Sequence, residues 1–154
     1  METDILSRHH AEIDDCIVKL LFRADGGDNH DLAAEWNLLE SELERHFGLE
    51  EHEVFPLFER ENPEEVARLR QEHAALRRDL LALGIRADLH FLRAEAVRDF
   101  VRDLRAHSTR EDETLYRWAA TDLAPGTWAR IAATLNHVAH SVGHAVKDLG
   151  SRTL

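Results

Sequence analysis

Residues 43–58 of the chain have the sequence LERHFGLEEHEVFPLF. Leu43, His46 and Glu50 are spaced by three and then four residues, so they fall on one face of a helix. Upstream, the same face carries apolar residues such as Trp36 and Leu39, as expected of a helix that packs against a core. A histidine and a glutamate therefore continue an apolar stripe, and both side chains are expected to point inward.

The rest of the chain has the same kind of spacing. It predicts helical segments over residues ~4–23, ~30–58, ~63–83, ~88–119 and ~126–148. Gly26-Gly27, Gly84 and Pro125-Gly126 are expected to separate segments, and nothing favours strands. Long amphipathic segments joined by short loops favour an all-α fold. We expect one domain over residues 1–154: an up-down four-helix bundle over residues 4–119, with an additional C-terminal helix, 126–148, against its outside.

The other bundle segments also carry ionisable residues on their core faces. His10 lies in the first stripe and His73 in the third, and in the fourth His107 is followed four residues later by Glu111. The two halves of the bundle therefore repeat one arrangement. His46 follows His10 by 36 residues, and His107 follows His73 by 34.

Six ionisable groups inside a bundle need partners, because an unpaired buried charge costs several kcal/mol. Imidazole nitrogen and carboxylate oxygen are good ligands for iron, manganese or zinc. The repeat therefore predicts a two-metal site in the bundle core. Its predicted ligands are His10, His46, Glu50, His73, His107 and Glu111. A hydrogen-bonded network without metal is the alternative.

The composition excludes several other classes of protein. A net charge of −11 argues against nucleic acid or an anionic membrane as partner. No apolar run approaches the ~18–20 residues that span a bilayer, and the N-terminus lacks a signal pattern, so a cytoplasmic location is expected. The single cysteine, Cys16, excludes a disulfide framework and a cysteine-rich metal site, and we expect it to be a small core residue.

Several neighbours of these six residues are expected to be peripheral. His9 lies about 100° around the helix from His10, at the bundle edge, and is the alternative ligand if the register differs. Glu51 is expected at the surface or behind a ligand. Tyr116 is expected at the core edge rather than as a tyrosinate ligand. His30, His52, His90, and the face formed by His137, His140 and His144, are expected to be solvated.

Together these motifs resemble the hemerythrin-like (HHE cation-binding) family. His46-Phe-Gly-Leu-Glu50-Glu51 with Val54-Phe55-Pro56 is similar to the second-helix signature of that family. The other helices are matched by His10-Ala-Glu-Ile, Gln71-Glu72-His73, and His107-x3-Glu111 with Leu115-Tyr116. The resemblance covers residues ~4–120. It implies a non-haem di-iron centre of two iron ions, which an oxo group could bridge, with zinc or manganese less suited. Its open position would meet O2 or a related small ligand.

The chain also departs from the oxygen carriers of that family. They have an extra histidine one turn after the third-helix ligand, where this chain has Arg77. Arg77 is expected either to pair with Glu50 or Glu111, or to gate small anions, or to lie on the surface. The oxygen carriers also use His-x4-Asp in the fourth helix, which would select Asp112, whereas the stripe favours Glu111. The chain thus resembles the H-HxxxE-H-HxxxE subgroup, which is linked to iron–sulfur repair and to nitric oxide or peroxide chemistry.

Two functions follow as hypotheses. The first is a di-iron protein that binds or turns over O2, peroxide or nitric oxide, as an enzyme or not. The second is an iron or oxygen sensor, or an iron store or donor, without turnover. A structural zinc bundle ranks last, because zinc favours four-coordinate sites with fewer carboxylates. The expected partner is a small diatomic or peroxide ligand, and the chain is expected to be a monomer or homodimer.

Overall fold

The computed structural model describes the backbone of residues 4–26 and 29–148, and the side chains of residues 4–26 and 32–136. The described chain contains helices and no strands. Their bounds are α1 (Ile5–Asp25), α2 (Asn29–Leu49), the π-helix η2 (Glu50–Val54), α3 (Phe55–Phe58), α4 (Pro63–Asp88), α5 (Ala94–Glu113), α6 (Leu115–Asp122) and α7 (Pro125–Asp148).

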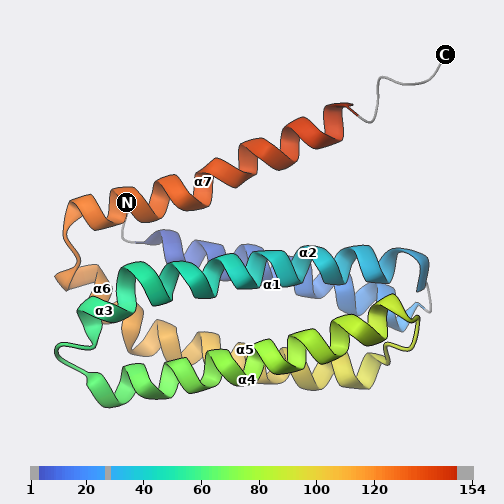
Figure 1. Ribbon diagram of the computed structural model, residues 1–154, viewed down its shortest axis with the longest axis horizontal. Coiled ribbons are helices and arrows are strands. Elements are labelled where there is room, and N and C mark those ends of the chain that lie inside the picture. The colour runs from blue at the N-terminus through green and yellow to red at the C-terminus, as the bar shows by residue number, and fades with distance from the viewer. Residues whose placement is uncertain (1–3, 27–28, 149–154) are drawn as a thin grey trace.

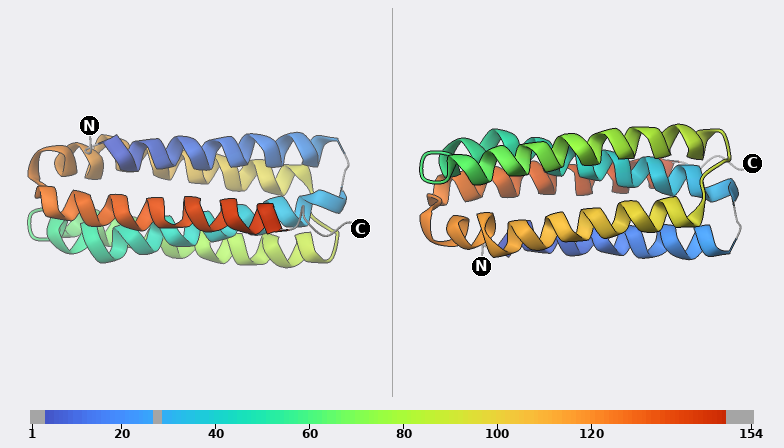
Figure 2. Two further views of the ribbon diagram at one scale, coloured as in Figure 1. Left: turned by 90° about the horizontal axis from the view of Figure 1, so that it is seen from above. Right: turned by 90° about the horizontal axis from the view of Figure 1, so that it is seen from below.

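Four long helices form the bundle (Figure 1). Each of α1, α2, α4 and α5 contacts its two neighbours, in the cyclic order α1, α2, α4, α5, so the four enclose one core. Successive helices run in opposite directions, as Figure 2 shows from two further sides. The predicted all-α, up-down bundle with an additional C-terminal helix is confirmed.

The start of α7 packs against one end of the bundle. Trp128 and Ile131 are buried in an apolar cluster that also contains residues of α3, α4 and α6. Within the described residues, no helix is both long enough and apolar enough to cross a membrane.

The core consists of two apolar clusters. One contains Ile13, Leu43 and Leu104 and extends towards the loop between α4 and α5. The other contains Leu6, Leu69 and other residues at the end where α3, α6 and α7 meet. His10, His73 and the His107–Glu111 pair each lie in sequence between a residue of one cluster and a residue of the other. Cys16 is half-buried and packs against the first cluster.

The helix breaks differ from the sequence prediction at two places that matter for the site. The second segment does not run evenly to Phe58, because a π-turn covers Glu50–Val54, where the Phe55 N–H donates to the Glu50 carbonyl. Pro56 explains why regular α-helix stops here, since its ring lacks an N–H and clashes with the carbonyl four residues back. The fourth segment breaks at Thr114, between α5 and α6.

Gly84 does not end a helix, contrary to the sequence prediction. It lies buried inside α4, which continues to Asp88. A Cβ atom at this position would lie 3.1 Å from Nε1 of the Trp36 indole, which is itself fully buried. The absence of a side chain therefore serves the packing of α4 against α2. The left-handed residue that follows the helix is His90, with φ of 59°.

This packing predicts different responses at two neighbouring positions. Gly84→Leu should lower the free energy of unfolding by about 1–3 kcal/mol, because the added side chain meets the Trp36 ring. Ala82→Leu, on the exposed face of the same helix, should change it by less than about 0.5 kcal/mol. Urea unfolding of both variants measures the difference, and equal stabilities would contradict the assigned role of Gly84.

Candidate metal centre

The six predicted ligand residues meet in the middle of the bundle. His10 comes from α1, His46 from the end of α2, Glu50 from the start of η2 and His73 from α4, while His107 and Glu111 come from α5. Five of them are buried, and His10 is almost so, with 11% of its side chain exposed. Their potential donor atoms form two groups that could each hold a metal ion.

The first group surrounds the Nε2 atoms of His10 and His46, which lie 2.9 Å apart. One oxygen of Glu111 lies 3.2 Å from His10 Nε2. One oxygen of Glu50 lies 3.2 Å from His46 Nε2. Two nitrogens and two oxygens therefore converge on one position.

The second group surrounds the Nε2 atoms of His73 and His107. Oε1 of Glu111 lies 3.2 Å from His73 Nε2 and 2.8 Å from His107 Nε2. Oε2 of Glu50 lies 3.4 Å from His73 Nε2. These oxygens are not the ones that face the first group. Glu50 and Glu111 thus each present one oxygen to each histidine pair, as bridging carboxylates would.

The donor set fits metal ions better than a hydrogen-bonded network. Glu50 Oε2, Glu111 Oε2 and His107 Nε2 are buried, and although another ligand atom lies 2.8–3.4 Å from each, none of the three makes a hydrogen bond with acceptable angles. A network without metal should have satisfied them, since unsatisfied buried polar atoms are costly. All three face the centre of the cluster, where an ion would complete their coordination.

The pKa values of the ligand histidines in the metal-free chain also favour a bound cation. Burial by itself lowers the pKa of His10, but the carboxylates of Asp112, Glu111 and Glu50 outweigh it and raise the pKa to about 10. Burial also lowers the pKa of His73, which Glu111 and Glu50 raise to about 10. The site therefore favours positive charge, which protons supply when metal is absent. Metal binding has to displace those protons.

The outward nitrogens of two ligand histidines are held by carboxylates that arginines hold in turn. His73 Nδ1 donates to Glu51 at 2.8 Å, and the Arg77 guanidinium donates to both oxygens of Glu51 at 2.7 and 3.2 Å. His107 Nδ1 donates to Glu72 at 2.6 Å, and Arg110 lies 3.5 Å from Glu72. Such partners fix the tautomer and the ring orientation that a metal needs.

Arg77 does not pair with Glu50 or Glu111, so that part of the sequence prediction is wrong. Besides Glu51 it binds Glu44, at 3.1 Å, and it covers the Phe47 ring. Its guanidinium therefore faces away from the cluster and orients His73 through Glu51. The placement of Glu51 behind a ligand, one of the two expectations for that residue, agrees with the structure.

His9 is buried, contrary to the expectation that it lies at the bundle edge. Its Nδ1 lies 2.8 Å from His46 Nδ1, and its Nε2 lies 3.2 Å from Glu42. Burial, and then the neighbouring His46, lower the pKa of His9 to about 4, so its ring is neutral. His46 therefore donates to His9, and His9 donates to Glu42. His9 thus holds the outward nitrogen of His46, as Glu51 holds that of His73 and Glu72 holds that of His107.

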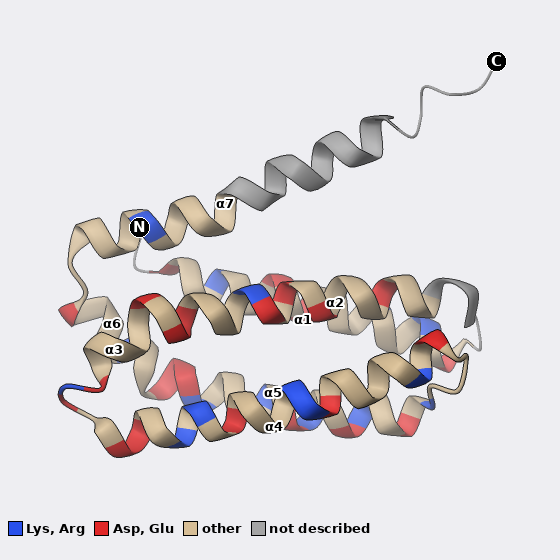
Figure 3. Cartoon of the chain, in the orientation of Figure 1, with Lys and Arg blue, Asp and Glu red and all other residues tan. Residues whose placement is uncertain are grey.

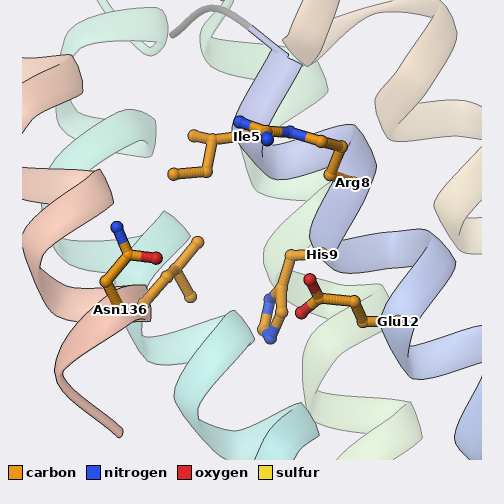
Figure 4. A pocket seen from close by; sticks show the side chains of 6 residues that line it. Ile5, Arg8, His9, Glu12 and Asn136 are labelled. Atoms are coloured by element: carbon orange, nitrogen blue, oxygen red, sulfur yellow. The ribbon is translucent and has the colours of Figure 1, made fainter. Parts of the chain in front are cut away.

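His9 also faces a pocket of about 190 Å³ between α1 and α7. Figure 4 shows His9 and Glu12 on one side of this pocket and Asn136 of α7 on the other. The spacing of α1 could not reveal this environment, because it depends on α2 behind the ring and on α7 above it.

Tyr116 is the residue that sequence reasoning placed least well. It is buried inside the ligand cluster, not at the core edge, with its phenol oxygen 2.9 Å from His10 Nε2 and 3.0 Å from His46 Nε2. It also donates a hydrogen bond to Glu50. The break at Thr114 changes the helix register, so a stripe drawn along a straight helix could not find it.

The remaining candidates lie outside the cluster. Asp112 is half-exposed and lies 3.5 Å from the outward Nδ1 of His10, so the inward residue is Glu111. His52 and His90 are exposed, as expected. The side chains of His30, His137, His140 and His144 lie outside the described residues.

The contact between His9 and His46 leads to a test. His9→Phe keeps a ring of similar shape but removes both hydrogen bonds, so the affinity for metal should fall roughly 10–100-fold. His52→Ala, which removes an exposed histidine of η2, should leave it unchanged. Competition titration with a metal-binding dye measures both affinities. Wild-type affinity in His9→Phe would show that the contact does not orient His46.

One comparison with known proteins gave a match. The family model described as hemerythrin HHE cation binding domain matches residues 1–119. No match was found among curated proteins or solved structures. The matched residues contain the whole bundle and all six predicted ligands. By this match, the chain belongs to the hemerythrin HHE cation-binding family.

Proposed function

We propose that the chain holds two iron ions, one at each histidine pair, and that this di-iron centre binds or reacts with O2, peroxide or nitric oxide. The observation that carries the proposal is the position of the two buried carboxylates. Glu50 and Glu111 each offer one oxygen to the His10–His46 pair and the other to the His73–His107 pair. A single ion would leave half of these donors unused.

Iron suits this donor set better than zinc does. Neighbouring donor atoms lie 2.8–3.4 Å apart within each group. For metal–donor bonds of about 2.0–2.2 Å, adjacent corners of an octahedron are about 3 Å apart, whereas zinc usually takes four tetrahedral ligands. Two divalent ions would carry four positive charges against two carboxylates. The resulting excess of positive charge favours a small anionic or reducible ligand.

The surroundings support ligand chemistry at a dry site. Phe47 and Phe55 both stack on the His73 ring, with centroid distances of 4.2 and 5.2 Å, and the histidine is fully buried. Together with Glu51, these rings fix the plane of the imidazole. Iron would supply the ability to change between ferrous and ferric states, while the chain positions its ligands.

The composition and optical spectrum of aerobically purified protein test the proposal. We expect two iron ions per chain and a near-ultraviolet absorption typical of ferric pairs. Stopped-flow mixing of the ferrous form with O2, peroxide and nitric oxide then separates the functions. A stable adduct favours binding or sensing, and rapid loss of peroxide favours turnover. A colourless protein with two zinc ions, or one with a single metal ion, would refute the proposal.

A second test concerns the ligands themselves. His73→Ala should reduce the iron content and lower the melting temperature of the loaded protein, since ligand binding adds about 4 kcal/mol of stability at a thousand times Kd. Gln71→Ala, on the exposed face of the same helix, should change neither property. Iron analysis and thermal unfolding with and without chelator measure both effects. Two iron ions in His73→Ala would remove this residue from the ligand set.

A further inference from the structure

An aromatic residue follows each His-x3-Glu motif at the same distance. Phe55 comes five residues after Glu50, and Tyr116 comes five residues after Glu111. The helix is interrupted between the two members of each pair, by η2 in one half and at Thr114 in the other. In an unbroken α-helix, a residue five positions on would lie about 140° around the axis. These interruptions bring both rings back to the core.

The two rings occupy equivalent places in the two halves. Phe55 packs on His73, with ring centroids 5.2 Å apart and planes inclined by 28°. Tyr116 packs on His10, with centroids 4.9 Å apart and planes inclined by 38°. Each ring thus lies against the lone ligand histidine of the opposite half. The equivalent residues differ by a single hydroxyl group.

That hydroxyl lies among the donor atoms of the first group. The Tyr116 oxygen is 2.9 Å from His10 Nε2 and 3.0 Å from His46 Nε2, while those two nitrogens are themselves 2.9 Å apart. These three distances match the edges of one octahedral face, which are about 3 Å long. The phenol oxygen also contacts the Glu50 oxygen that faces His46.

We propose that the phenol oxygen of Tyr116 is a fifth protein donor to the ion held by His10 and His46. The ion held by His73 and His107, next to Phe55, then has only four protein donors, and this ion has the extra open position for a small exogenous ligand. This inference rests on the proposed two-iron centre and adds an asymmetry to it. Arg77 cannot supply the missing donor to the second ion, because a guanidinium has no lone pair to offer a metal, and its N–H groups bind Glu44 and Glu51.

The state of the phenol depends on the metal. In the metal-free chain the phenol keeps its proton and donates it in a hydrogen bond to Glu50. A bound ion reverses the local electrostatics. To bind an ion, the Tyr116 oxygen would have to give its proton to water, and this exchange of an O–H bond for an oxygen–metal bond would change no oxidation state.

The chain offers an unusually clean test, because Tyr116 is its only tyrosine. Ferric protein should show a visible charge-transfer band from tyrosinate to iron. Resonance Raman spectra excited in this band should contain phenolate ring modes, which must shift when the protein is grown with ring-deuterated tyrosine. An unlabelled sample is the control. Two bound iron ions without these modes would overturn the inference and leave the di-iron proposal intact. Absence of iron would instead refute the di-iron proposal.

Two matched variants test the asymmetry. Tyr116→Phe should keep two iron ions, lose the visible band and bind one azide ion more per chain than the wild type does. Phe55→Tyr should keep the band and bind one azide ion fewer than the wild type does, because the second ion gains the same donor. Iron analysis, absorption and azide titration measure these changes. An unchanged band in Tyr116→Phe, or unchanged azide binding in both variants, would overturn the assignment.

Discussion

The structure depends on burying six ionisable side chains in one layer of a four-helix core. The apolar clusters on either side of this layer hold the helices together, but they cannot stabilise the charges between them. Glu50, His73 and Glu111 have no exposed surface. Desolvation of such groups costs several kcal/mol each unless partners compensate. The partners of these side chains supply that compensation, through hydrogen bonds to the outward nitrogens of three of the imidazoles and through the Tyr116 hydroxyl that the helix break brings to Glu50.

The outward partners of the histidines also connect the helices. Arg77 of α4 reaches Glu51 of η2, and His107 of α5 reaches Glu72 of α4. His46 is joined through His9 to Glu42, and so α2 is joined to α1. Acidic and basic residues are interspersed along the bundle helices (Figure 3). Helix pairing and ligand orientation therefore rest on the same contacts.

The two halves follow one plan with one consequential difference. Each has a lone histidine, a His-x3-Glu pair, a helix interruption and an aromatic ring. The two interruptions differ, since one is a π-turn followed by Pro56 and the other is a break at Thr114. Both nevertheless place their aromatic rings, Phe55 and Tyr116, at equivalent positions. A hydroxyl on only one ring makes the two histidine pairs unequal in neighbouring donor atoms. The repeat supplies the two donor groups of the proposed two-ion site, and the departure from the repeat would distinguish its two ions.

The sequence by itself determined the helices, the bundle and the six inward residues, because a period of three and four residues decides which side chains share a face. The sequence did not determine which residues of the other helices each helix face contacts. Gly84 proved to be a packing residue because Trp36 of another helix meets it, and His9 proved to be buried because α2 lies behind it. Arg77 binds Glu51 and Glu44 instead of Glu50 or Glu111. Tyr116 reached the cluster only because the helix breaks before it. Spacing describes one helix, whereas these four residues are placed by contacts between helices and by changes in helical register, which only the tertiary structure supplies.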